Sequence, residues 1–134
     1  MIDTINNGTT CPSVLVVDDE PDNVSLMEAY LALDYNIIPA YNGEQALEKV
    51  QTEIPDLVLL DMMMPGINGH EVCKTLRKNP QTCDIPIVMF SALGKREGYT
   101  KCLRAGADAF LEKPIDAVQL VNTIRALIER PEAK

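Results

Sequence analysis

Short apolar runs alternate with longer amphipathic segments along the chain, and this alternation predicts its architecture. The short runs end at polar or turn residues, which is typical of strands buried on both faces of a parallel sheet. In the clearest case, four consecutive apolar residues lead directly into Asp61, and a Pro-Gly turn follows. We expect strands at residues 13–17, 37–38, 57–61, 85–90 and 109–112.

The segments between these runs repeat apolar residues at helical spacing. Asn42 and Asp116 are typical N-cap residues, and Pro21 suits the first position of a helix. The fourth segment has the weakest helical pattern because it contains Gly98 and few large apolar residues, and we expect it to be mobile. The predicted helices cover residues 21–33, 43–54, 69–78, 95–105 and 117–128.

Five strands that alternate with five helices predict an α/β fold. Such alternation favours a doubly wound parallel sheet with right-handed crossovers and helices on both faces. A chain of 134 residues is long enough for one domain with a full core. We expect a flexible leader at residues 1–12, the domain at 13–130, and a tail or linker stump at 131–134.

Composition argues against several functions. The formal net charge is −8 and there is no basic stripe, so direct binding of nucleic acid is not expected. No apolar run approaches the roughly 18 residues of a membrane span, and residues 1–10 lack the pattern of a signal peptide. We therefore expect a cytoplasmic protein with reduced thiols. One histidine and four dispersed cysteines make a zinc site improbable.

Polar residues stand where four of the predicted strands end. Parallel strands point the same way, so these residues should meet at the carboxyl edge of the sheet, where open α/β folds bind ligands. An isolated aspartate such as Asp61 could instead cap a turn, but the convergence of four strand ends favours a site. The converging residues are Asp18, Asp19, Asp61, Ser91 and Lys113.

These residue types favour phosphoryl transfer. Clustered carboxylates without histidine or cysteine suit a hard cation such as Mg²⁺. The ammonium of Lys113 and the hydroxyl of Ser91 are suited to contact phosphoryl oxygens, and Asp61 could act as a nucleophile that forms an acyl phosphate.

Four blocks of sequence resemble the signature of the receiver domain of two-component response regulators. They occur in the family's order and at its spacing, and the resemblance covers about residues 13–130. It implies a flavodoxin-like (CheY-like) fold with strand order 2-1-3-4-5. The blocks are VLVVDDE at 14–20, LLDMMMPG at 59–66, FSA at 90–92 and LEKP at 111–114.

The resemblance implies a role for each of these residues. Asp61 would accept the phosphoryl group from a histidine kinase or phosphotransfer protein, and Ser91 and Lys113 would contact it. Mg²⁺ or Mn²⁺ would be held by Asp18, Asp19, Asp61 and the backbone carbonyl of Met63. The Lys113–Pro114 peptide bond would be cis, which is rare outside X-Pro bonds.

The resemblance also implies how a signal leaves the domain. Ser91 and Phe110 would form a switch that alters the face made by the fourth helix, fifth strand and fifth helix. That face would control a downstream protein or an output domain. The chain would be a monomer or a phosphorylation-dependent homodimer, with no catalysis beyond weak self-phosphorylation and self-dephosphorylation.

Other functions remain open on the sequence. A phosphohydrolase with an aspartyl nucleophile usually carries a second acid two residues later, where this chain has Met63. A receiver-like interaction module that is never phosphorylated would not need competent residues at every site position. The chain could also be one receiver from a longer regulator.

Overall fold

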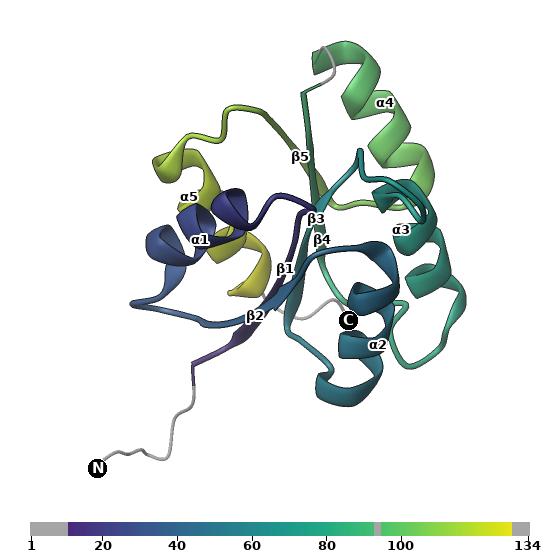
Figure 1. Cartoon of the computed structure of the whole chain (residues 1–134), viewed down its shortest axis with the longest axis horizontal. Coiled ribbons are helices and arrows are strands. Elements are labelled where there is room, and N and C mark those ends of the chain that lie inside the picture. Colours follow the sequence, from purple (N-terminus) through teal and green to yellow (C-terminus); the bar gives the residue numbers. More distant parts are fainter. Residues whose placement is uncertain (1–10, 93–94, 130–134) are drawn as a thin grey trace.

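A parallel sheet forms the middle layer of the structure, with helices on both of its faces (Figure 1). The computed structural model describes residues 11–92 and 95–129, and within these the sheet has five strands in the order β2-β1-β3-β4-β5. Every neighbouring pair is parallel, which confirms the predicted fold class. The strands are β1 (Ser13–Val17), β2 (Asn36–Ala40), β3 (Leu57–Asp61), β4 (Ile87–Ser91) and β5 (Ala109–Glu112).

The helices cover opposite faces of the sheet in two groups (Figure 1). Side chains of β3 alternate between the two cores: Leu59 packs with the α1 and α5 side, and Leu60 with the α2, α3 and α4 side. This double burial explains the uninterrupted apolar run of β3. The helices are α1 (Pro21–Leu31), α2 (Gly43–Glu53), α3 (Gly69–Lys78), α4 (Lys95–Ala105) and α5 (Ala117–Ile128).

Several predicted bounds were wrong by a few residues. The first helix ends at Leu31, whose carbonyl accepts hydrogen bonds from the next turn, so Leu33 lies outside the helix and is 96% exposed. The fourth strand begins at Ile87 rather than Ile85, because the Ile85 carbonyl accepts a side-chain hydrogen bond. The second strand is longer than predicted, from Asn36 to Ala40.

Residues 1–10 and 130–134 lie outside the described residues, so the predicted leader and tail stay predictions. Among the described residues, no helix is long and apolar enough to cross a membrane. The predicted caps of α2 and α5 are confirmed, since Asn42 and Asp116 each accept a backbone hydrogen bond. A complete capping box, which the sequence analysis did not assign, starts α3 at Asn68 with Glu71.

Arg77 joins three segments at the amino end of the sheet. Its guanidinium donates to the carbonyls of Gly106, Cys83 and Ile85 at 2.9, 2.9 and 2.7 Å. It also forms an ion pair with Asp108 at 2.9 Å. The planar fork of five donors makes this simultaneous bonding possible.

Arg77→Lys is expected to lower the free energy of unfolding by about 1 kcal/mol, because one ammonium cannot reach all of these acceptors. Urea unfolding measures the loss. Arg104→Lys, at an exposed position of α4, is the matched control and should change stability little. Equal losses in the two variants would contradict this role of Arg77.

Candidate functional site

The carboxyl edge of the sheet carries the polar residues identified from the sequence. Asp61 and Ser91 are the last residues of β3 and β4, and Asp18 and Lys113 directly follow β1 and β5. Backbone hydrogen bonds continue the ladders past the strand ends, since the Asp18 N–H donates to Ala40 at 3.2 Å and the Lys113 N–H to Ser91 at 2.9 Å. The sheet therefore holds the backbone of these residues in place.

Two buried carboxylates share one ammonium at this edge. The Lys113 Nζ lies 3.1 Å from Asp61 Oδ2 and 3.5 Å from Asp18 Oδ2. Asp18 and Asp61 are buried, whereas Asp19 is exposed and Lys113 is half-buried. The Lys113 ammonium also lies 5.3 Å from the centroid of the Phe90 ring. Because the described residues place only the ammonium of Lys113 against these carboxylates, this part of the cluster has an excess of negative charge.

The ionisation of the cluster follows from this crowding. Burial and, to a smaller extent, the nearby Asp18 carboxylate raise the pKa of the Asp61 carboxyl to about 6 from its ordinary value of 3.8. The Met63 N–H, which donates to Asp61 Oδ1 at 3.1 Å, and the Lys113 ammonium oppose this rise. Burial alone would lower the pKa of Lys113, but the carboxylates of Asp61 and Asp18 raise it above its ordinary value.

The three aspartates are placed to hold a cation. Asp18, Asp19 and Asp61 each offer a carboxylate oxygen, and these oxygens all lie within 4.8 Å of one another. Hard oxygen ligands and excess negative charge fit Mg²⁺, which keeps several waters and needs few protein ligands. The described contact of Met63 is made by its N–H, so metal binding by its carbonyl stays a prediction.

Asn23 holds Asp18 in position, and the sequence analysis missed it. Its side-chain Nδ2 donates to Asp18 Oδ2 at 3.2 Å and to Glu20 Oε1 at 2.8 Å. The Glu20 N–H donates to Asp18 Oδ1 at 2.9 Å. A signal was present, because Pro21 at the helix start places Asn23 in the first turn of α1, next to the end of β1.

The two predicted switch residues lie on neighbouring strands, Ser91 at the carboxyl end of β4 and Phe110 inside β5. In the β4–β5 register Ser91 pairs with Glu112, and Phe110 pairs with Met89, which is two residues before Ser91 on β4. The Phe110 ring packs toward α4: a Cβ added to Gly98 would lie 2.6 Å from its Cζ. The glycine that weakened the helical pattern therefore gives the Phe110 ring its space.

Comparisons with known proteins agree with this geometry. A family model described as the response regulator receiver domain matches residues 14–125. The response regulator PleD of Caulobacter vibrioides is 44% identical over 115 residues, which cover 85% of this chain and 25% of that protein. The alkaline phosphatase synthesis transcriptional regulatory protein PhoP of Bacillus subtilis is 39% identical over 120 residues, covering 89% of this chain and 49% of that protein.

Solved structures show the same fold. A putative response regulator from Chloroflexus aurantiacus superposes with a TM-score of 0.86 at 31% identity, covering 90% of this chain and all of that one. The chemotaxis protein CheY4 of Vibrio cholerae superposes with a TM-score of 0.82 at 28% identity, covering 88% of this chain and 99% of that one.

The fold and the acidic edge define a doubly wound signalling domain of the CheY-like class. The chain belongs to the receiver domain family of two-component response regulators, as its sequence blocks indicated. Receiver domains bind Mg²⁺ at an acidic pocket and interact with histidine kinases or phosphotransfer proteins and with output domains. This chain spans about a quarter to a half of the length of the curated relatives described above.

The Lys113–Pro114 peptide bond is cis, as the resemblance implied. The residues that the resemblance assigned to the phosphoryl group and to the metal lie at one edge of the sheet. This common location does not by itself assign a role to each residue.

Proposed function

We propose that this chain is a phospho-accepting switch domain in which Asp61 receives a phosphoryl group with the help of Mg²⁺. One observation carries the proposal: the buried Asp61 carboxylate lies 3.1 Å from the Lys113 ammonium, beside the carboxylates of Asp18 and Asp19. A nucleophile, a cation for the phosphoryl oxygens and a set of metal ligands are thus within reach of one another.

Each residue has a part in the proposed transfer. Asp61 attacks the phosphorus of the donor, and the leaving group departs with its bonding electrons. Lys113 and the Ser91 hydroxyl contact the transferred phosphoryl oxygens, while Asn23 keeps Asp18 in place. Mg²⁺ held by Asp18, Asp19, Asp61 and the Met63 carbonyl would offset the charge of the phosphoryl group.

Phosphorylation would then bias the switch. The new phosphoryl oxygens draw Ser91 toward Asp61, and the Phe110 ring moves into the space that Ser91 leaves. To change the ratio of active to inactive conformations from 1:99 to 99:1, phosphorylation must stabilise the active conformation by about 5.5 kcal/mol relative to the inactive one. Charge-assisted hydrogen bonds of about 1.5–3 kcal/mol each supply most of this free energy. The altered face is that of α4, β5 and α5.

The surrounding assignments are part of the same proposal. The receiver unit covers residues 13–130 and works in the cytoplasm, where a histidine kinase or phosphotransfer protein supplies the phosphoryl group. Its output goes to a downstream protein or to an output domain, with the chain as a monomer or a phosphorylation-dependent homodimer. The net charge of −8 argues against direct contact of this chain with nucleic acid.

Intact mass spectrometry after incubation with Mg²⁺ and acetyl phosphate tests the proposal. Wild type should gain one phosphoryl group, and Asp61→Asn or addition of EDTA should abolish the gain. Asp34→Asn, at an exposed aspartate between α1 and β2, is the matched control and should be phosphorylated like wild type. Phosphorylation of Asp61→Asn, or none on wild type, would refute it.

Phe110→Ala should leave this phosphorylation intact but prevent it from changing the conformation of α4. Phosphorylation of wild type should change amide hydrogen exchange within residues 95–105, and this change should fall at least about fivefold in the variant, because its side chain cannot fill the vacated space. Leu103→Ala, at an exposed position of α4, is the control. An undiminished change in Phe110→Ala would contradict the switch.

A further inference from the structure

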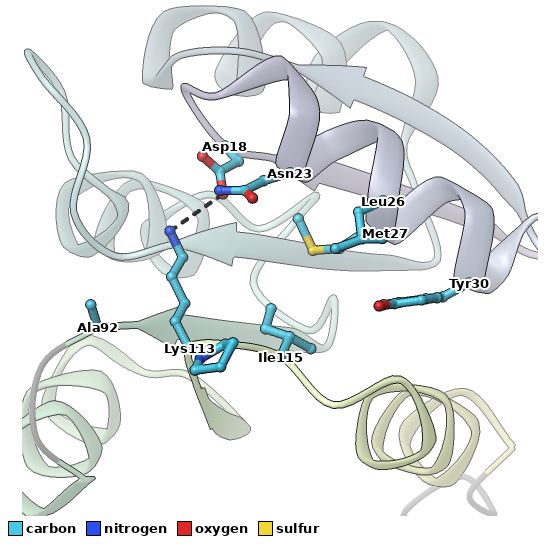
Figure 2. Close-up of a pocket in the computed structure, with 9 residues that line it drawn as sticks. Asp18, Asn23, Leu26, Met27, Tyr30, Ala92, Lys113 and Ile115 are labelled. Atoms are coloured by element: carbon cyan, nitrogen blue, oxygen red, sulfur yellow. Dashed lines mark hydrogen bonds and ion pairs between the residues drawn. The ribbon is translucent and has the colours of Figure 1, made fainter.

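A groove opens next to the acidic cluster, between α1 and the loop that follows β5 (Figure 2). Its volume is about 520 Å³, which lies within the range of small-molecule sites. Lys113 and Asp18 line the groove and also belong to the acidic cluster. The groove is therefore continuous with the place where a phosphoryl group would sit.

The two ends of the groove differ in character. Figure 2 shows the Lys113 ammonium close to Asp18 and Asn23 at one end, with Tyr30 far from them at the other. Helical spacing along α1 explains this order, because Asn23, Met27 and Tyr30 follow one another on one side of the helix.

Apolar side chains form the part of the groove away from the ammonium. Leu26 and Met27 of α1 lie on one side, and Ile115 lies on the other. Leu26 is 48% exposed although it stands on a helix with a well-packed core face. A ligand that covered it would remove apolar surface from water, which is favourable.

This shape fits a ligand with an anionic head and an apolar tail. The phosphoryl head would lie at Lys113, where the proposed function already places it, while the tail lies along Leu26 and Tyr30. The methyl group of acetyl phosphate would leave most of the 520 Å³ unfilled.

We propose that the groove binds the tail of an acyl phosphate, so that the chain accepts phosphoryl groups from acyl phosphates with longer apolar chains in preference to acetyl phosphate. The inference rests on the proposed function and adds a class of donor to it. An oxygen of the Asp61 carboxylate forms the new bond to phosphorus. The bond between phosphorus and the acyl oxygen breaks, and the fatty acid leaves as a carboxylate with the electron pair, with no net proton transfer.

The test compares hexanoyl phosphate with acetyl phosphate. The two donors have leaving groups of nearly equal basicity and differ only in the length of the apolar chain. Each buried methylene is worth roughly a factor of four in affinity, so partial burial of the longer chain should lower KM by about tenfold. Initial rates of phosphorylation, followed by intact mass at a series of donor concentrations, give KM and the maximal rate separately.

Two serine variants locate the tail. Leu26→Ser should reduce the ratio of the two KM values by about threefold or more, because it removes apolar contact at the groove. Leu33→Ser changes an exposed leucine just beyond the same helix and should leave the ratio unchanged. An equal effect of both variants would overturn the inference.

The outcomes separate this inference from the proposed function. If acetyl phosphate and hexanoyl phosphate modify Asp61 with equal KM, the proposed function stands and the donor preference is refuted; the groove then serves another occupant, such as a helix of a partner protein. If neither donor modifies Asp61 in the presence of Mg²⁺, both are refuted.

Discussion

Asp61→Asn is expected to raise the free energy of unfolding of the metal-free protein by about 2 kcal/mol at pH 8, although it removes the proposed phosphorylation site. The cause is the crowding of two buried carboxylates around one ammonium. Asparagine keeps an oxygen that can accept from Lys113 and carries no charge, so the repulsion with Asp18 disappears.

The gain in stability should depend on pH in a defined direction. The pKa of Asp61 is about 6 in the folded protein and near 3.8 when unfolded, so the folded state binds the proton more tightly. The stability that this carboxyl contributes is fully present below about pH 4 and is lost as the pH rises through about 6. Asparagine does not titrate. The difference in unfolding free energy between Asp61→Asn and wild type should therefore grow from about pH 4 to about pH 6 and then level off.

Urea unfolding in EDTA at pH values from 4.5 to 8 measures this difference. Asp34→Asn is the matched control, because it removes an equal charge from an exposed position. Addition of Mg²⁺ should stabilise wild type more than Asp61→Asn, since ligand binding to the folded state raises stability. A variant less stable than wild type at pH 8 in EDTA would contradict this account of the cluster.

The parts of the fold that the sequence predicted are those that depend on single segments. The run before Asp61 is apolar throughout because both faces of β3 are covered, and that pattern is visible without any partner. Asp18, Ser91 and Lys113 could be placed at the same edge because parallel strands share a direction. Strand identity and strand ends were therefore enough to find the candidate site.

What sequence reasoning missed depends on contacts between distant segments. The hydrogen bonds that Arg77 donates to four acceptors join the end of α3 to Cys83, Ile85, Gly106 and Asp108. No local sequence pattern predicts hydrogen bonds between segments so far apart in the chain. The groove likewise needs α1 to lie beside the loop after β5. The sequence analysis interpreted Gly98 only as a residue that weakens its helix. In the structure, the Phe110 ring occupies the space that a side chain at position 98 would need.

Gly69→Ala is expected to cost about 3 kcal/mol or more in unfolding free energy, the largest stability effect proposed for a single methyl group in this protein. A Cβ at Gly69 would overlap the backbone oxygen of Asp61 and lie 2.8 Å from the Cα of Met62. These are backbone atoms that cannot rotate away. The Gly69 N–H also donates to the Met62 carbonyl at 3.1 Å, so the start of α3 is tied to the end of β3.

Relief of this overlap would have to move the backbone that carries Asp61. We therefore expect folded Gly69→Ala, where it persists, to bind Mg²⁺ at least about fivefold more weakly, because metal sites tolerate little displacement of their ligands. Urea unfolding and calorimetric titration with Mg²⁺ measure the two effects.

Gly66→Ala separates the steric effect from the general cost of replacing a glycine. Gly66 has a φ of +74° and no atom within 4 Å of an added Cβ, so only conformational strain of about 1 kcal/mol is expected. Both glycines lie in the segment between β3 and the first turn of α3. Equal losses of stability in the two variants would show that small shifts relieve the contact with Asp61, and would contradict the steric requirement for glycine at position 69.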